Sequence, residues 1–352
     1  MPSETKAQTD VHGNSGHGRL PLLDGIRGVA AVGVALSHFF VQQGQTLWGE
    51  AVAALSVEIF FPLSGFVLAP QILKVAETPS HLGVFYFRRW MRTLWPYWTA
   101  LAISALLVSP PFPWRQAILY FFCVQDWFPN WSSGGFYPVA WSLAVEEWYY
   151  LLFPLWVMAG RRLGQSPLAC CLAFIGCFQA AKLFALAGDP GQFLRTGTWF
   201  RLDAIALGFL GYLFRHHLKR GLQIWLPAAA AATGLVFSME SVGGQTPDSF
   251  DRWLFINSSG IFFTLCVVAA SHAPQPLSGG PLAWLCLWMG KLSYPVYLLH
   301  LFFIPFSLRL AGENMAAGLT FYLAVLIIAS LAFHQLIEKP VLARRPDYRP
   351  TG

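Results

Sequence analysis

Residues 20–43 read LPLLDGIRGVAAVGVALSHFFVQQ, and the part from Gly28 to Phe40 is an apolar stretch typical of a helix. It begins at Arg27 and carries His38 deep inside, eleven positions further on. Eleven positions are about three helical turns, so both side chains lie on nearly one face, roughly 16 Å apart along the axis. An ionisable side chain inside a membrane-like segment is costly and by default indicates a functional site. The alternative is that His38 only hydrogen-bonds a neighbouring helix.

The composition indicates an all-α, polytopic membrane protein. The chain has 352 residues, of which 55% are hydrophobic and 11% are charged, and its mean hydropathy is +0.50. Soluble domains are about 25% charged. The net charge of +6 is expected to reflect cytoplasmic Lys and Arg rather than nucleic-acid binding. The six cysteines lie in or beside apolar stretches without zinc-ligand spacing, so we expect core residues and no metal site.

Apolar runs of bilayer length predict about ten transmembrane helices. They lie near 26–43, 50–73, 93–110, 138–159, 167–187, 201–215, 222–239, 253–271, 284–310 and 315–336. The apolar run 116–124 is too short to cross, so we expect it to be re-entrant or interfacial. Lys and Arg gather in the even-numbered connections and in both tails, which places both termini in the cytoplasm. Residues 1–19 are polar and are expected to be a disordered cytoplasmic tail, and 343–352 a second cytoplasmic tail.

The stretch FYFRRWMRTLWPYW, residues 85–98, brings arginines to the predicted cytoplasmic end of the third span. Arg89 and Arg92 are i,i+3 neighbours on one helix face. Guanidinium groups bind phosphate bidentately, so the pair is a candidate phosphate clamp. The alternatives are a purely topological role or binding of anionic lipid.

Three further stretches carry charged or polar groups into apolar segments. Glu58 lies inside the second span, where burial favours a partner or a raised pKa, and a structural ion pair is the alternative. Glu146 and Glu147 are adjacent and therefore about 100° apart around a helix, so only one can face a given cavity. Arg201 and Asp203 lie at the outer end of a span and can pair with each other or with a neighbour.

The remaining polar features are a segment near the C-terminus and an aromatic loop. In GKLSYPVYLLHLFF, residues 290–303, Pro295 is predicted to break the helix. Tyr294 and His300 lie inside this segment. The outer loop 125–137 is rich in aromatic residues, which indicates an interfacial belt, with sugar stacking as the alternative.

Taken together, these stretches resemble the acyltransferase 3 family of integral membrane acyltransferases. The resemblance rests on an ordered set of motifs: Arg-x10-His (27–38), FFPLSGF (60–66), RRWMR–x–x–x–P (88–96), WSLAVEEWYYLLFP (141–154), FRLDAIALG (200–208) and SYPVYLLH (293–300). It makes residues 20–342 a membrane acyltransferase domain. The family pattern usually has Asp where this chain has Glu58, which keeps the charge but lengthens the reach by one methylene group.

The resemblance implies transfer of an acyl group, acetyl by default, from cytoplasmic acyl-CoA to a hydroxyl of a carbohydrate or lipid-linked glycan. It also implies location in a bacterial cytoplasmic (inner) membrane. His38 is the expected general base or, alternatively, an acyl-accepting nucleophile, with Glu146 or Glu58 orienting its imidazole. The expected acyl-CoA-binding residues are Arg27, Arg88, Arg89 and Arg92. The expected substrate-binding residues are Ser64, Trp141, Arg201, Asp203, Tyr294 and His300.

A transporter or flippase of a polar substrate is the alternative function. About ten spans with interior charges and a Pro-containing helix also describe a carrier. Inverted repeats would favour that interpretation, and the sequence has none that we can detect.

Overall fold

The computed structural model describes residues 20–44, 46–107, 114–129, 131, 135–218, 221–239, 249–276, 280–312 and 314–348. Within these ranges every regular element is helical and there is no strand, which confirms the predicted all-α class. The predicted disordered tail 1–19 lies outside the described residues.

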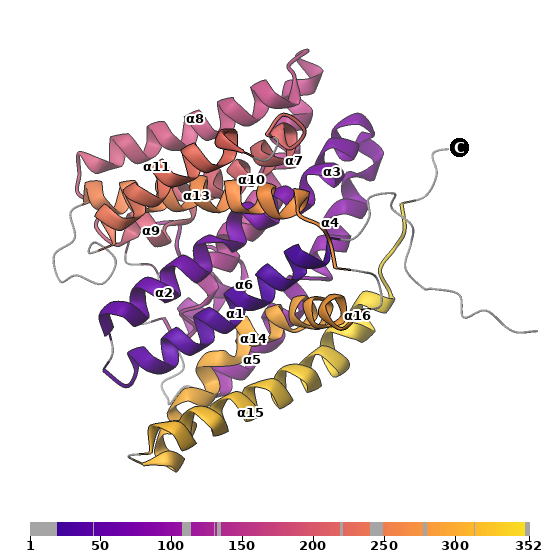
Figure 1. Cartoon of the computed structure of the whole chain (residues 1–352). Helices are drawn as coiled ribbons and strands as arrows, with labels where there is room; N and C mark the ends of the chain where they lie inside the picture. Colours follow the sequence, from indigo (N-terminus) through magenta and orange to yellow (C-terminus); the bar gives the residue numbers. More distant parts are fainter. Residues whose placement is uncertain are drawn as a thin grey trace, which may run out of the picture.

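The helices follow one another along the chain as Figure 1 labels them. The first half contains α1 (Pro21–Val41), α2 (Thr46–Glu58), α3 (Phe60–Glu77), η1 (Pro79–His81), α4 (Leu82–Trp90), α5 (Leu94–Leu107), α6 (Trp114–Phe121) and α7 (Ala140–Arg162). The second half contains α8 (Pro167–Leu186), α9 (Phe193–Thr196), η2 (Thr198–Phe200), α10 (Leu202–Phe214), α11 (Leu222–Ser238), α13 (Ser249–His272), α14 (Pro281–Ala311), α15 (Met315–Phe333), η3 (His334–Glu338) and α16 (Lys339–Ala343).

Six of the described helical segments are long and apolar enough to cross a bilayer. They are Pro21–Val41, Gly49–Glu77, Pro167–Leu186, Ser249–His272, Pro281–Leu310 and Met315–Ala343. Each coincides with a predicted span, and the chain is therefore an integral membrane protein. The other predicted spans coincide with α5, α7, α10 and the apolar helix α11. Ten crossings and cytoplasmic termini stay predictions. The predicted re-entrant or interfacial run 116–124 overlaps α6, which has eight residues and is too short to cross.

Close helix contacts depend on small residues. Helix α3 crosses α10 where Gly65 faces the backbone of Ile205, and Gly208 of α10 faces the backbone of Pro62. A side chain at either glycine would overlap a carbonyl oxygen of the opposite helix. Small residues let helix backbones approach in membranes, where the hydrophobic effect between helices is absent.

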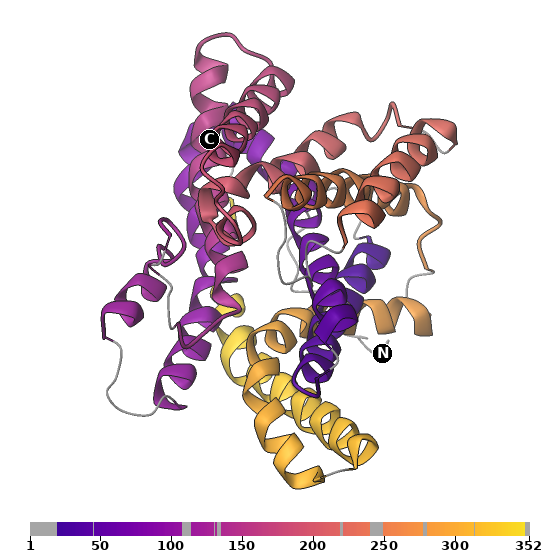
Figure 2. The ribbon, with the colours of Figure 1, turned by 90° about the vertical axis from the view of Figure 1, so that its left-hand side faces the viewer.

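Helices α1, α14 and α15 form a second packed group. Helix α1 packs along α14, and α14 packs along α15. In Figure 2 the yellow α15 lies with α14 at the bottom of the view, whereas the magenta α7 and α8 lie at the upper left. This arrangement places the N-terminal Arg-x10-His helix beside the segment that carries Tyr294 and His300.

The predicted helix break at Pro295 is wrong. Helix α14 is continuous from Pro281 to Ala311 and contains both Pro295 and Pro305. A proline inside a helix removes one backbone hydrogen bond and costs about 3 kcal/mol. Packing against α1 and α15 along its length offsets that cost, because a helix in a membrane is held by its neighbours as well as by its own bonds.

Two rings of the predicted aromatic loop pack inside the protein. The Tyr137 side chain is 1% exposed, and its hydroxyl donates to the carbonyl oxygen of Leu298 over 2.9 Å. The Trp127 ring lies 4.6 Å from the Trp148 ring and 5.0 Å from the Trp199 ring, measured between centroids. These contacts fix Trp127 against α7 and η2, and Tyr137 against α14.

Candidate active site

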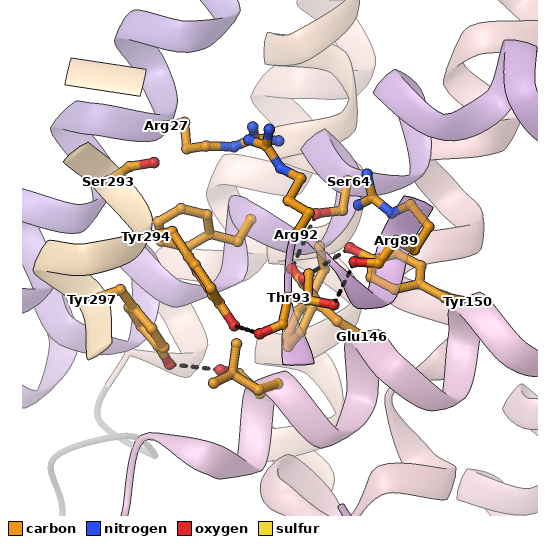
Figure 3. A pocket seen from close by; sticks show the side chains of 14 residues that line it. Arg27, Ser64, Arg89, Arg92, Thr93, Glu146, Tyr150, Ser293, Tyr294 and Tyr297 are labelled. Carbon is orange, nitrogen blue, oxygen red and sulfur yellow. Dashed lines mark hydrogen bonds between the residues drawn. The ribbon is translucent and has the colours of Figure 1, made fainter. Parts of the chain in front are cut away.

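A pocket of about 610 Å³, including its open mouth, lies between α1, α3, α7, α14 and the turn from α4 to α5. Figure 3 shows the side chains of Arg27, Arg89 and Arg92 turned toward it. Six of the residues predicted from the sequence line the pocket: Arg27, Ser64, Arg89, Arg92, Glu146 and Tyr294.

The three arginines come from two separate parts of the chain. Arg27 lies on α1, Arg89 lies near the end of α4, and Arg92 lies in the turn that leads into α5. The guanidinium carbon of Arg89 is 4.6 Å from the ring centroid of Tyr150, which holds this side chain against α7. Nε of Arg89 is buried without a hydrogen-bond partner among the described residues. Three cations around one cavity favour a ligand with negative charge.

Glu146 is held rigidly beside these cations. Its two carboxylate oxygens accept hydrogen bonds from the Ser64 hydroxyl, over 3.0 Å, and from the Tyr150 hydroxyl, over 2.8 Å. The adjacent Glu147 does not line the pocket. The prediction that only one of the two carboxylates faces the cavity is therefore confirmed, since consecutive residues on a helix point in different directions.

Two tyrosines of α14 close the pocket on the side of α1. The Tyr294 hydroxyl donates to the carbonyl oxygen of Thr93 over 2.8 Å, which ties α14 to the start of α5. The Tyr297 hydroxyl lies 2.6 Å from the hydroxyl of Ser142 on α7. Figure 3 shows both rings on the same wall of the pocket. Thr93, Ser142, Tyr150 and Tyr297 also line the cavity, and sequence reasoning missed them because no single-residue signal marks them.

His38 lies behind this wall and contacts a second histidine. Nδ1 of His38 is 3.2 Å from Nε2 of His300, and the two ring centroids are 5.0 Å apart. Tyr297, which lines the pocket, also contacts the histidine pair, since its ring centroid is 5.9 Å from that of His300. His38 and His300 do not themselves line the pocket.

The hydrogen bonds of the pair determine which nitrogens carry protons. Nδ1 of the buried His300 is 2.8 Å from the carbonyl oxygen of Tyr297, which can only accept. In a neutral imidazole Nδ1 therefore holds the proton and Nε2 accepts. Nδ1 of His38 must then donate to Nε2 of His300. The same N–H group also points at the carbonyl oxygen of Val34, which lies 3.0 Å from Nδ1. Nε2 of His38 is left unprotonated, and it has no hydrogen-bond partner within the described part of the chain.

The carboxylates expected to orient His38 are not its hydrogen-bond partners. Glu58 accepts from the guanidinium of Arg201 and, over 3.2 Å, from the hydroxyl of Ser259. The Glu58 and Arg201 side chains are both 0% exposed. The alternative of a structural ion pair therefore describes Glu58, which joins the junction of α2 and α3 to α10 and α13.

Asp203 belongs to a second buried pair. Its Oδ2 lies 2.6 Å from Nζ of Lys182, and it also accepts from Nε2 of Gln179 over 2.8 Å. Of the two options left open by the sequence, Asp203 and Arg201 thus pair with neighbours rather than with each other. Lys182 was a missed residue, although a lysine inside the apolar run 167–187 was a visible signal.

The last two predicted residues lie outside the pocket. The ring of Trp141 lies under the guanidinium of Arg195, with 5.3 Å from Cζ to the centroid. Arg88 points away from the cavity, donates to the carbonyl oxygen of Pro346 and lies 3.3 Å from a carboxylate oxygen of Asp347. Among the described residues, no group of three or more His, Cys, Asp or Glu side chains is arranged to hold a metal ion.

Comparison with known proteins identifies the family. A family model described as an acyltransferase domain matches residues 20–335. The chain is 26% identical to the acyltransferase MdmB of Streptomyces mycarofaciens, over 95% of this chain and 94% of that protein. It is 25% identical to the O-acetyltransferase OatA of Staphylococcus aureus, over 92% of this chain and 57% of OatA. The chain thus matches little more than half of OatA's length.

No solved structure matches the chain. Both relatives are named acyltransferases, and these comparisons do not support the transporter alternative. The family match covers α1 to α15 and the whole pocket, and six helical segments of this region are able to cross a bilayer. The chain therefore belongs to the acyltransferase 3 family of integral membrane acyltransferases.

Proposed function

We propose that this membrane acyltransferase moves an acyl group, acetyl by default, from acyl-CoA to a hydroxyl of a carbohydrate or glycoconjugate. The observation that carries the proposal is the convergence of Arg27, Arg89 and Arg92 on one pocket. Coenzyme A carries several phosphate charges, and arginine is well suited to bind phosphate through paired hydrogen bonds. The printed name of OatA, an O-acetyltransferase, supports oxygen as the accepting atom.

The pocket suggests how the donor lies. The arginines hold the pyrophosphate at the predicted cytoplasmic end of α1, and the thin pantetheine arm runs toward His38. Glu146 is positioned by Ser64 and Tyr150, so its remaining lone pairs can accept from the amide N–H groups of that arm. Tyr297 lines the pocket and contacts His300, so the thioester that approaches His38 is proposed to pass beside its ring.

His38 supplies the proton chemistry in this proposal. Its unprotonated Nε2 takes the proton from the acceptor hydroxyl, and the hydroxyl oxygen attacks the thioester carbonyl. The carbon–sulfur bond breaks, the acyl group stays on the acceptor oxygen, and the leaving thiolate takes up the proton that His38 removed from the hydroxyl. Attack by Nε2 itself, with a transient acyl-imidazole, is the second route. His300 holds His38 in the required tautomer in both routes.

The bilayer that surrounds the protein is proposed to be a bacterial cytoplasmic membrane. An acyl-CoA donor is made in the cytoplasm, and the predicted topology puts Arg27, Arg89 and Arg92 on that side. The acceptor would then be presented within or across the membrane.

Calorimetric binding of acetyl-CoA to the purified, detergent-solubilised protein tests the donor. We expect saturable binding to the wild type and strongly weakened binding to Arg89→Ala/Arg92→Ala. The matched control is Arg161→Ala/Arg162→Ala, which removes the same charge from the end of α7, outside the pocket. If both double variants lose the same affinity for acetyl-CoA, Arg89 and Arg92 act only through their charge and not as a specific phosphate site. If the wild type does not bind acetyl-CoA, acyl-CoA is not the donor.

A further inference from the structure

The segment 344–348, which we call the C-terminal segment, is docked against α3 and α4. Arg88 on α4 donates to the carbonyl oxygen of Pro346 and pairs with Asp347 over 3.3 Å. The ring of Tyr348 is 5.2 Å from Cζ of Arg88 and 5.0 Å from Nζ of Lys74. In Figure 1 the yellow segment beyond α16 runs up toward α3 and α4. These contacts hold the segment beside the arginine-rich end of the pocket.

Buried polar atoms without partners gather where this segment docks. The ring of His81 lies 5.2 Å from that of Tyr348, and the His81 side chain is 9% exposed. Both ring nitrogens of His81 and the hydroxyl of Tyr348 lack a hydrogen-bond partner among the described residues. Nε of Arg88 and Nε of Arg345 are likewise buried and unpaired there. A buried donor without a partner costs about 1–3 kcal/mol, so such a cluster indicates a site for an acceptor-rich ligand.

The cluster is also strongly positive. Arg345 lies near Arg88, Arg89 and Arg92, and burial together with their charges lowers the pKa of its guanidinium to about 9. The Asp347 carboxylate, whose side chain is 85% exposed, pairs with Arg88, and the carboxylates of Asp24 and Glu338 lie near Arg92. Unbalanced positive charge at the mouth of a cleft attracts anions. The C-terminal segment thus adds a cation to the site, although Arg345 is more than 250 positions from Arg88.

Arg88 and Arg345 lie close to the pocket but do not line it. Arg89 and Arg92 line the pocket, whereas Arg88 and Arg345 lie next to them but outside it. One group of arginines therefore lines the pocket, and a second group lies beside it. Coenzyme A also carries negative charge at two places, a pyrophosphate in the middle of the molecule and a 3′-phosphate on its ribose.

We propose that Arg345 and Arg88, with Lys74, His81 and Tyr348, form a rim site that binds the 3′-phosphate of coenzyme A. This inference rests on the proposed acyl-CoA donor. The C-terminal segment then acts as a specificity element, because it distinguishes coenzyme A from its 3′-dephospho form. Arg345 and Tyr348 lie beyond the matched family region, whereas Arg88, Lys74 and His81 lie inside it.

The test compares the affinities of the full-length, solubilised protein for coenzyme A and for 3′-dephospho-coenzyme A. Loss of one charge-assisted contact costs at least about 1.5 kcal/mol, so we expect the wild type to prefer coenzyme A by about tenfold or more. Arg345→Ala should reduce that preference to nearly one while leaving the affinity for the dephospho form unchanged. The matched control is Arg344→Ala, because Arg344 is exposed and adjacent. A preference that persists in Arg345→Ala overturns the proposal.

Two further experiments distinguish the rim site from the acyl-CoA proposal on which it rests and from binding of lipid headgroups. If the wild type binds both ligands equally and binding is lost in Arg89→Ala/Arg92→Ala, the acyl-CoA donor stands and the rim site fails. If the wild type binds neither ligand, both proposals fail. Repeating the comparison in phosphatidylcholine and phosphatidylglycerol nanodiscs tests lipid headgroups as the phosphate source. Sensitivity to phosphatidylglycerol that disappears in Arg345→Ala, with an unchanged ligand preference, would assign the rim to lipid and overturn the proposal.

Discussion

Replacement of His300 by Phe should lower the turnover number for acyl transfer while leaving the KM for acetyl-CoA nearly unchanged. Nε2 of His300 accepts a hydrogen bond from the Nδ1–H group of His38 over 3.2 Å, and the His300 side chain is 0% exposed. Phenylalanine fills similar space but accepts nothing. His300 does not line the pocket, so donor affinity should survive.

The magnitude follows from the geometry. His38 becomes a cation when it takes the hydroxyl proton, and a hydrogen bond to a charged group contributes about 1.5–3 kcal/mol. The separation of 3.2 Å is at the long end of the usual range, and Val34 retains its own bond to Nδ1 of His38. We therefore take the lower value, about 1.5 kcal/mol, which corresponds to roughly a tenfold decrease in turnover number.

A second variant separates positioning from structure. In His300→Gln the side-chain carbonyl reaches about as far as Nε2 of the imidazole, so it can accept from His38 and should restore most of the turnover. The assay is steady-state transfer of acetyl to a soluble hydroxyl acceptor, with thermal unfolding of each variant measured in the same detergent. Near-normal turnover in His300→Phe, or equal loss in the Gln and Phe variants at equal stability, would refute the tautomer argument.

Three other perturbations test separate parts of the structure. His38→Ala should lower the rate of acyl transfer by about 10²–10⁴-fold, as expected for loss of a general base, with acetyl-CoA binding retained; near-normal turnover excludes His38 from the mechanism. Glu58→Gln should destabilise the protein by about 3–5 kcal/mol in unfolding measurements, because it leaves the buried charge of Arg201 without a partner, and Glu58→Gln/Arg201→Gln should cost less. If the single variant is as stable as the wild type, the pair has no structural role. Cysteines placed at Gln43 and His217 in a cysteine-free background should react with membrane-impermeant reagent from opposite sides, and labelling from one side would overturn the topology.

Much of the candidate site could be predicted because its signals are local. Arg89 and Arg92 were recognisable as a cationic pair, although the structure places Arg92 in the turn after α4 and not on the helix face of Arg89. Glu146 and Glu147 were recognisable as residues of which one alone faces a cavity. Six predicted residues do line one pocket. The prediction of a helix break at Pro295 was wrong for the opposite reason. Whether the helix continues through this proline depends on contacts with α1 and α15, which a local rule does not contain.

The sequence by itself determined that this is an all-helical membrane protein of the acyltransferase 3 family, since apolar length, charge distribution and motif order are properties of consecutive residues. Only the tertiary structure decided which distant groups meet. His38 is paired with His300, Glu58 with Arg201, and Arg88 with the C-terminal segment. The physical reason is that periodicity gives the face of a helix on which a side chain lies, whereas its partner depends on how whole helices pack. For Glu58 that packing selected an ion pair, and for His38 it selected a second histidine in place of a carboxylate.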